Sequence, residues 1–241
     1  MSRKTSLVDL ALWTAGSACV ACLSMVLYHR IKADVRRQAV AKAQTGQSSK
    51  ASNKKQGVIV IIGVGGVGSH AAHILSRSGY TNLRLVDFDL ISLSSLNRHC
   101  SAVHTDVGRL KTLVMKEYIE SYGGPHCRVE SVGNTFCDKS ADSILRSGEG
   151  EDKVLFVLDC IDNTETKAEL LAQCLKRRLR VVSSMGAGSR ADPTRLHVSN
   201  ISEVKGDELG RAVRMQLTNK TGLVLREVNI PCVWSSETAR K

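Results

Sequence analysis

Apolar runs that alternate with glycine turns and helical segments predict a chain of alternating strands and helices. The first convincing strand, GVIVIIG, opens at Gly57 and leads into a glycine-rich turn. The next segment, SHAAHILSRSG, predicts a helix that Gly79 stops, and a second strand runs over 83–86. A continuous apolar run over 154–158 predicts a further strand. Strands that are buried on both faces have this pattern, so we expect an α/β fold with a mainly parallel sheet.

A different pattern precedes this body. Residues 10–28 are nineteen residues without a charge, and as a helix they would span roughly 28 Å, about the hydrocarbon thickness of a bilayer. Trp13 and Tyr28 lie near the ends of the stretch, as aromatic residues at membrane interfaces do. We therefore predict one N-terminal transmembrane helix. The expected organisation is a membrane anchor over 1–29, a basic linker over 30–57 and a folded domain over 58–241.

The charges around the apolar stretch predict its orientation. Arg30, Lys32, Arg36 and Arg37 follow it closely, so the positive-inside rule places the folded domain in the cytosol. A moderately apolar anchor with basic flanks favours the mitochondrial outer membrane, with the endoplasmic reticulum membrane as the alternative. Because the stretch also contains Ala, Gly, Ser and Thr, a cleaved signal or import sequence is a further alternative.

Charge and cysteine content narrow the function classes. The net charge is +11, but residues 1–57 hold 10 Lys/Arg against 2 Asp/Glu, whereas residues 58–241 hold 24 against 21. Basicity therefore does not by itself indicate that the folded domain binds RNA. The single Cys-x-x-Cys, Cys19 and Cys22, lies inside the apolar stretch, where a zinc site is implausible. We expect the other cysteines, Cys232 among them, to be reduced and packed thiols.

The glycine turn predicts a nucleotide site. It reads GVGGVG, with glycines at 63, 65, 66 and 68, between the first strand and its helix. Strand, glycine turn, helix, strand and acid is the order of a mononucleotide-binding unit in a doubly wound, Rossmann-like sheet. Glycines let the backbone approach phosphates, and the helix N-terminus attracts anions. Asp87, at the end of the second strand, is placed to accept hydrogen bonds from ribose hydroxyls. An NAD enzyme would show the same features.

Cations after Asp87 favour ATP over NAD. Arg98 and Lys111 are candidates to neutralise the charge that grows on the α-phosphate and on the departing pyrophosphate. Asn97, beside Arg98, would orient an oxygen. A dinucleotide domain alone has no need of these residues.

The strand over 154–158 ends in DCIDN, at the edge of a parallel sheet where ligands bind. Asp162 is a candidate ligand for Mg²⁺ that bridges phosphate oxygens, and Asn163 is a candidate nucleotide contact. Asp159 either faces the ligand crevice or caps the following turn.

Together, GVGGVG, LVDFD, SLNRH, DVGRLK and DCIDN resemble, in order and spacing, the ubiquitin-activating-enzyme-like (ThiF/MoeB-type) adenylyltransferases. The resemblance implies ATP and Mg²⁺ as cofactors and a homodimeric assembly. It implies catalytic roles for Arg98, Lys111 and Asp162, with Asp162 also the metal ligand. The implied nucleotide-binding residues are Gly63, Gly65, Gly66, Gly68, Asp87, Asn97, Arg98, Lys111, Asp162 and Asn163.

The second half of the chain indicates a branch of this family. The folded domain has no Cys-x-x-Cys, and its VVSSMGAGSR, DPT and CVWSSE motifs resemble the tRNA threonylcarbamoyladenosine dehydratases. That resemblance implies ATP-dependent dehydration (cyclisation) of N6-threonylcarbamoyladenosine at position 37 of tRNA through an acyl-adenylate. It also implies tRNA as the substrate partner and, for eukaryotic members, a mitochondrial location with an N-terminal membrane segment.

Two alternatives stay open. Activation of a ubiquitin-like or sulfur-carrier protein uses the same adenylation chemistry. The other alternative is a nucleotide-binding scaffold without turnover. Members of the family carry an arginine motif before the first strand, and Arg36 and Arg37 do not match that motif. Two interpretations of the basic run over 176–180 have equal weight. Its cations could stabilise the C-terminal end of a helix, or they could form a local track for tRNA phosphates together with Arg190, Arg195, Arg211 and Arg214.

Overall fold

The computed structural model describes residues 57–125, 127–146 and 153–238. The predicted anchor over 10–28 and nearly all of the linker over 30–57 lie outside these ranges. Within the described ranges, every helix is too short or too polar to cross a membrane.

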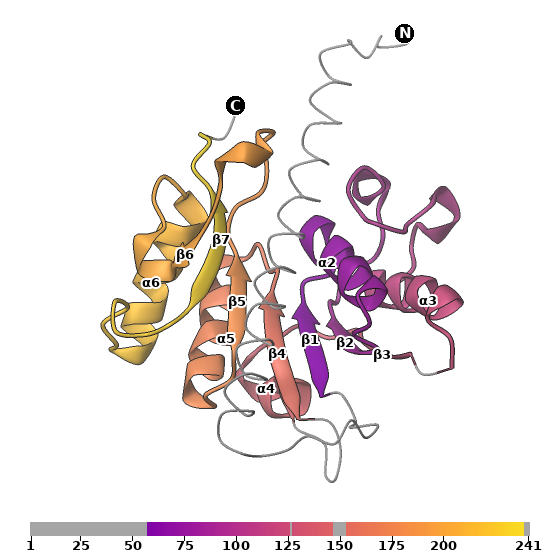
Figure 1. Cartoon of the computed structure of the whole chain (residues 1–241), viewed down its shortest axis with the longest axis horizontal. Coiled ribbons are helices and arrows are strands. Elements are labelled where there is room, and N and C mark those ends of the chain that lie inside the picture. Colours follow the sequence, from indigo (N-terminus) through magenta and orange to yellow (C-terminus); the bar gives the residue numbers. More distant parts are fainter. Residues whose placement is uncertain (1–56, 126, 147–152, 239–241) are drawn as a thin grey trace, which may run out of the picture.

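A seven-stranded sheet forms the centre of the molecule (Figure 1), in the order β3-β2-β1-β4-β5-β7-β6. All neighbouring strands are parallel except β6, which pairs antiparallel with β7. The mainly parallel, Rossmann-like α/β fold expected from the sequence is therefore confirmed. The strands are β1 (Val58–Ile62), β2 (Asn82–Val86), β3 (Arg128–Val132), β4 (Val154–Asp159), β5 (Val181–Ser184), β6 (Leu196–Asn200) and β7 (Pro231–Ser235).

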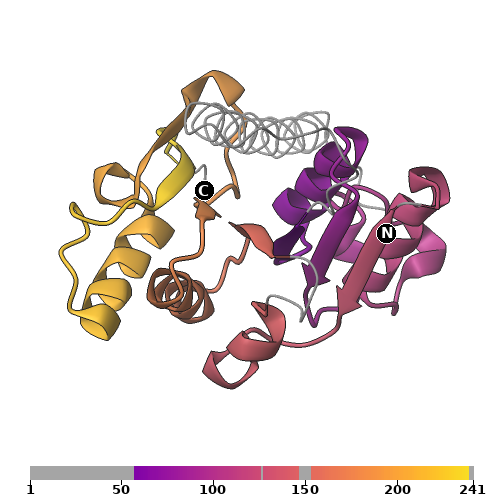
Figure 2. The same ribbon diagram turned by 60° about the horizontal axis from the view of Figure 1, so that its bottom comes forward.

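Helices cover both faces of this sheet (Figure 2). On one face, α2 and α3 pack against alternate residues of β1 such as Ile59 and Ile61. On the other face, Val58, Val60 and Ile62 belong to the core cluster that also contains buried residues of α4, α5 and α6. Because both faces are covered, every residue of β1 is buried, which explains its uninterrupted apolar run. The helices are α2 (Gly66–Arg77), α3 (Lys111–Gly123), α4 (Asp138–Ile144), α5 (Thr164–Lys176) and α6 (Glu208–Thr221).

Four short 3-10 turns complete the described elements: η1 (Leu93–Ser95), η2 (His104–Asp106), η3 (Pro193–Arg195) and η4 (Ile201–Glu203). The chain runs from β1 outward to β3 on one side, then returns to β4 beside β1 and continues to β5 on the other side. The strand order thus reverses between β1 and β4. Ligands of such sheets bind outside the carboxyl ends of the strands at this reversal point.

Candidate active site

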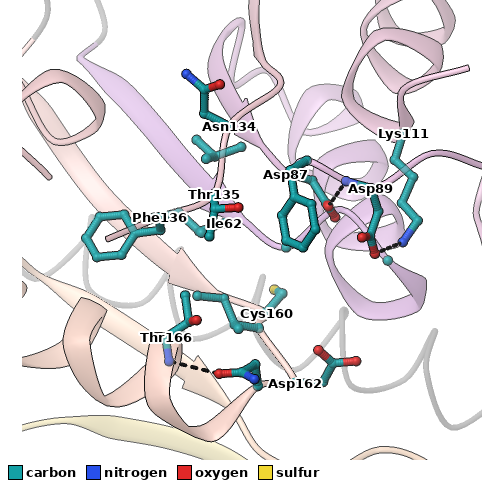
Figure 3. Close-up of a pocket in the computed structure, with 16 residues that line it drawn as sticks. Ile62, Asp87, Asp89, Lys111, Asn134, Thr135, Phe136, Cys160, Asp162 and Thr166 are labelled. Atoms are coloured by element: carbon teal, nitrogen blue, oxygen red, sulfur yellow. Dashed lines mark hydrogen bonds and ion pairs between the residues drawn. The ribbon is translucent and has the colours of Figure 1, made fainter. Parts of the chain in front are cut away.

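Two adjoining pockets lie at the carboxyl ends of β1 and β4. The small pocket has a volume of about 150 Å³ and the large pocket about 430 Å³. The residues common to both are Gly65, Asp89, Lys111, Cys160, Ile161 and Asp162, so the two pockets form one cleft with two ends. Figure 3 shows Asp87, Asp89 and Lys111 on one side of the small pocket and Thr166 with Asp162 on the other. Every predicted site residue except Gly68 lines one pocket or both.

The four glycines of the turn fall into two groups, one required for backbone packing and one that leaves open space in the cleft. A β-carbon at Gly68 would lie 1.8 Å from the carbonyl oxygen of Gly63, and one at Gly63, whose φ is +88°, would lie 2.6 Å from that of Cys160. These two glycines let β1, α2 and the turn after β4 approach one another. By contrast, a β-carbon at Gly65 meets nothing within 4 Å, and one at Gly66 would only touch the side chain of Arg98. Gly68 therefore serves packing, whereas Gly65 and Gly66 leave space in the cleft.

Asp87 closes one side of the small pocket. Its carboxylate accepts hydrogen bonds from the backbone N–H of Val64 at 2.7 Å and of Asp89 at 2.9 Å. Burial raises the pKa of Asp87, and the two N–H donors and nearby Lys111 partly offset this shift. Each carboxylate oxygen accepts two hydrogen bonds or more, so acceptor capacity remains for a ligand in the pocket.

Lys111, the first residue of α3, forms an ion pair that the sequence analysis missed. Its Nζ lies 2.6 Å from Oδ2 of Asp89, and its backbone N–H donates to the carbonyl of Asp89. The lysine side chain is 9% exposed and that of Asp89 49% exposed. The cation therefore stands at the junction of the two pockets, held by an acid that solvent reaches.

Asn97 and Arg98 lie on the rim of the large pocket, just after η1. The guanidinium Nη1 of Arg98 donates to the carbonyl of Ser94 at 2.5 Å and to Oδ1 of Asn97 at 3.2 Å. Arg98 is exposed, so its charge is available to a ligand. Asn97 thus acts on the position of Arg98 as well as lining the pocket.

The turn after β4 carries Asp162 and Asn163. Asn163 caps α5, because its side-chain oxygen accepts from the backbone N–H of Thr166 at 3.0 Å. Asp162 is exposed and lines both pockets. Asp159 is fully buried instead, where it pairs with Lys167 and accepts from the N–H of Ile161. Of the two alternatives for Asp159, the structure supports the one in which it binds the following turn.

The apolar wall of the small pocket was not predicted from the sequence. Ile62, Val86, Phe88 and Phe136 line it, together with Asn134 and Thr135. The residues at 134–136 follow β3, which reaches the cleft only because β3 lies next to β2 in the sheet. Their position after the carboxyl end of a strand was the available signal.

The loop Met185–Ser189 after β5 forms the far wall of the large pocket. Buried Arg190 supports it: its guanidinium donates to the carbonyl of Gly186, to the carboxylate of Asp207 at 2.7 Å and to the carbonyl of Glu237 at 3.0 Å. Glu237 in turn accepts from the backbone N–H groups of Ala191 and Asp192, each at 2.8 Å. The loop is therefore fixed by residues from β7's end and from the start of α6.

The described cysteines differ in exposure: Cys174 and Cys232 are buried, half-buried Cys160 lines both pockets, and Cys137 is exposed, contrary to the expectation of a packed thiol. Cys232 is fully buried, and this burial raises the pKa of its thiol, as expected of a packed cysteine. Desolvation lowers the pKa of both His70 and His73. Over the described ranges, no three His, Cys, Asp or Glu side chains are grouped in a way that could hold a metal ion.

The basic residues do not form one continuous track. Helix α5 begins at the cleft with Thr164 and ends at Lys176. The run over 176–180 therefore lies toward the amino-terminal ends of the strands, away from the cleft. Arg190 is buried, and Arg214 donates to the carbonyls of Ile201 and Val204. Buried Arg190 therefore cannot contact a phosphate, whereas Arg195 and Arg211 are exposed, so a tRNA phosphate track stays a prediction only without Arg190.

Comparison with known proteins agrees with this geometry. A model described as the ThiF family matches residues 35–221. The chain is 37% identical over 179 residues to tRNA threonylcarbamoyladenosine dehydratase 2 of Saccharomyces cerevisiae, covering 74% of this chain and 38% of that protein. It is 33% identical over 186 residues to the Haemophilus influenzae tRNA threonylcarbamoyladenosine dehydratase, covering 76% and 69%. The chain thus spans about two fifths of the yeast relative.

Among solved structures, the chain is similar to the Escherichia coli tRNA N6-threonylcarbamoyladenosine dehydratase in complex with ATP. The TM-score is 0.70 and the sequence identity 31%, over 76% of this chain and 74% of that one. The same enzyme has also been solved with AMP, with the same TM-score.

Proposed function

Because this chain belongs to the ThiF family, we propose that it is an ATP-dependent adenylating enzyme that dehydrates N6-threonylcarbamoyladenosine at position 37 of tRNA. The observation that carries the proposal is the convergence of Arg98, Lys111 and Asp162 on the large pocket beside Gly65 and Gly66. Relatives at 32–37% identity named as dehydratases of this nucleoside support the choice of substrate.

The small pocket is suited to the adenosine of ATP. Its apolar wall and the rings of Phe88 and Phe136 match a flat base, and Asn134 offers both a donor and an acceptor to the base edge. Asp87, which lines the small pocket, accepts hydrogen bonds from the ribose hydroxyls. The phosphates then run past Gly65 and Gly66 toward the large pocket, along the N-terminus of α2, where the helix dipole favours anions.

Asp162 fits the role of a Mg²⁺ ligand. Its carboxylate is exposed in both pockets, and Mg²⁺ commonly uses one or two carboxylates together with substrate phosphates. Asp159 is unsuited to be a second ligand because Lys167 and Ser183 occupy its carboxylate. When bound, the metal supplies charge neutralisation at the phosphates.

In the proposed reaction, the carboxylate of the threonylcarbamoyl group attacks the α-phosphorus of ATP and pyrophosphate leaves. Arg98 and Lys111 stabilise the charge that moves onto the phosphate oxygens. The carbamoyl group of the same modification then attacks the acyl carbon, closes a ring and expels AMP. The nucleoside loses one water in total, and no nucleophile of the protein is needed. Buried Cys232 is consistent with this route.

Incubation of the full chain with ATP, Mg²⁺ and threonylcarbamoylated tRNA tests the proposal. Mass spectrometry of the digested nucleosides should show loss of one water from the modified adenosine, with one AMP formed per event. ATP binding without this loss would instead favour the scaffold. AMP release that depends on an added protein ending in Gly-Gly would favour activation of a carrier protein.

We propose that the enzyme is a homodimer. Between β2 and α3, large apolar side chains are exposed to solvent, Leu93 at 65% and Val103 at 57% among them, as at surfaces that bind a partner. Leu93 lies in η1, five residues before Arg98, so a second copy seated here would adjoin the large pocket. Sedimentation of the full chain should give a dimer that Leu93→Glu with Val103→Glu dissociates; a monomeric parent would contradict this.

The membrane anchor over 10–28 and the mitochondrial outer membrane remain proposals that rest on the sequence alone. The apolar length and the basic flank that follows support them. Alkaline extraction of isolated membranes should leave the full chain in the pellet and release a chain without residues 1–29. Release of both chains would contradict the anchor.

A further inference from the structure

Lys167 is buried to an extent that is unusual for a lysine. Its side chain has 0% exposure, as does that of its partner Asp159, and the two atoms Nζ and Oδ2 lie 2.9 Å apart. Lysines are almost never fully buried unless they are paired. Neither residue lines the small or the large pocket of the cleft, so a direct contact with nucleotide does not explain the pair.

Both charged groups also bind the backbone of a single residue, Ile161, in the turn after β4. The Nζ of Lys167 donates to the carbonyl of Ile161 at 2.8 Å. The Oδ1 of Asp159 accepts from the N–H of the same Ile161 at 3.2 Å. The backbone donor and the backbone acceptor of Ile161 are therefore held together, one by each member of the pair.

Asp159 extends this arrangement across the sheet. Its Oδ2 accepts from the hydroxyl of Ser183 at 2.5 Å, and Ser183 lies opposite it in the register of β4 and β5. Ser183 immediately precedes Ser184 and the loop that forms the far wall of the large pocket. One carboxylate thus joins β4, β5 and, through Lys167, α5.

Stability alone is a weak reason for such a pair. Removing two charges from water costs several kcal/mol, and apolar replacements of buried ion pairs are often neutral or stabilising. The hydrogen bonds to Ile161, in contrast, act on a specific target, because Ile161 immediately precedes Asp162 and Asn163. All three residues line the cleft.

We propose that Lys167 and Asp159 are positioning residues, a buried clamp that fixes the two peptide groups on either side of Ile161 and thereby aims Asp162 into the cleft. The clamp itself is a property of the folded chain, whereas its effect on the metal and on ATP rests on the proposed function. Neither residue touches the reacting atoms.

The first arm of the test is independent of ATP. Amide hydrogen exchange of the full chain should show a protected Ile161 N–H. In the double variant Asp159→Leu with Lys167→Met, which removes both charges together, this amide should exchange at least about tenfold faster. The control Lys176→Met, at the exposed far end of α5, should leave it unchanged. A folded Leu/Met variant with parental Ile161 exchange would overturn the proposal.

The second arm measures AMP formation as Mg²⁺ is titrated. The Mg²⁺ concentration that gives half the maximal rate should rise about 10–100-fold in the Leu/Met variant, as for other residues that orient metal ligands. The affinity for AMP should change by less than about threefold, since most of the small pocket comes from β1, β2 and the segment after β3. An unchanged Mg²⁺ requirement would overturn the link between clamp and metal.

A neutral pair separates hydrogen bonding from charge. Asp159→Asn with Lys167→Gln keeps an acceptor and a donor, so it should retain the protected Ile161 amide and the parental Mg²⁺ requirement. If the Leu/Met variant does not fold, the parent chain decides: an Ile161 N–H that exchanges as fast as an exposed amide overturns the clamp. If the parent itself forms no AMP, the proposed function fails, while Ile161 exchange still decides whether the clamp exists.

Discussion

Nζ of Lys111 lies 2.6 Å from Oδ2 of Asp89 at the junction of the two pockets. A phosphate that binds there must compete with this carboxylate for the cation. Asp89→Asn should therefore tighten ATP binding in the absence of metal, by about threefold, because the acid is half exposed and its charge is screened. Lys111→Met should weaken binding by on the order of tenfold. Calorimetric titration measures both; weaker binding by the Asn variant would show that Asp89 itself contributes to the site.

Arg98 is expected to act on the rate more than on the fold. Its side chain is exposed, so Arg98→Ala should leave the thermal midpoint of unfolding nearly unchanged. AMP formation should fall by on the order of a thousandfold, as for other arginines that stabilise phosphoryl charge. Arg226→Ala, an exposed arginine that lines neither pocket, is the matched control. Near-normal turnover in Arg98→Ala would refute the assigned role.

The glycine turn offers a matched pair of substitutions. Gly68→Ala places a methyl group against the carbonyl of Gly63 and should destabilise the fold by about 3 kcal/mol or more. Gly65→Ala meets open space, so the free energy of unfolding should change by less than about 1 kcal/mol. ATP affinity should nevertheless fall, because the methyl group fills the phosphate path. Denaturant unfolding and ATP titration separate the two effects, and equal loss of stability in both variants would contradict the division of roles.

His99 should make stability depend on pH. Burial and nearby cations lower the pKa of His99 to about 4, from an ordinary value of 6.5. Its Nδ1 accepts from the N–H groups of Ser101 and Ala102, which a protonated Nδ1 could not do. Between pH 6.5 and 4 the unfolded chain binds a proton that the folded chain does not. The free energy of unfolding should therefore fall with falling pH, by up to about 1.4 kcal/mol per unit from this group.

Above pH 6.5 the histidine is neutral in both states and should contribute no slope. His99→Asn keeps an acceptor near the Nδ1 position and removes the titration. Urea unfolding from pH 4.5 to 7.5 measures the free energy of unfolding at each pH. Below pH 6.5 this free energy should change less steeply with pH in the variant than in the parent, by the slope that one titrating group contributes. Identical slopes in parent and variant would mean that His99 titrates normally.

Cys232 distinguishes the proposed route from thioester transfer. The thiol is fully buried, and burial raises its pKa, so Cys232→Ala removes no reacting group. The variant should form AMP at a rate within about twofold of the parent and lose stability on the order of 1 kcal/mol. Trapping of a thiol-linked intermediate in the parent, lost in this variant, would contradict a route without a protein nucleophile.

The sequence was most informative where one short segment carries a whole structural unit. The glycine turn and Asp87 each directly follow a strand, so the local pattern placed them correctly in the cleft, whereas Asn97 and Arg98, which lie beyond η1, were found through the residue types of their motif. In contrast, Phe136 and Asn134 follow a strand that reaches the cleft through sheet order, which no local pattern encodes.

Charged residues were the hardest to interpret. Lys167 and Arg190 look like ordinary surface cations in the sequence, yet both are buried against carboxylates on other elements of the fold, Asp159 and Asp207. Asp89 likewise sits in a loop, and only the position of Lys111 gives it a partner. Pairings of this kind depend on tertiary distances, so they follow from the fold and not from spacing.

The carboxylate of Glu237 accepts hydrogen bonds from the backbone N–H groups of Ala191 and Asp192, and this contact has a consequence for the design of fusion proteins. A purification tag or reporter joined directly after Ser235 would remove Glu237 with its two hydrogen bonds and loosen the far wall of the large pocket, which residues 185–189 form. Fusions are therefore best attached beyond Thr238, and a truncation series across Ser236 and Glu237 should lose activity abruptly, at a single residue.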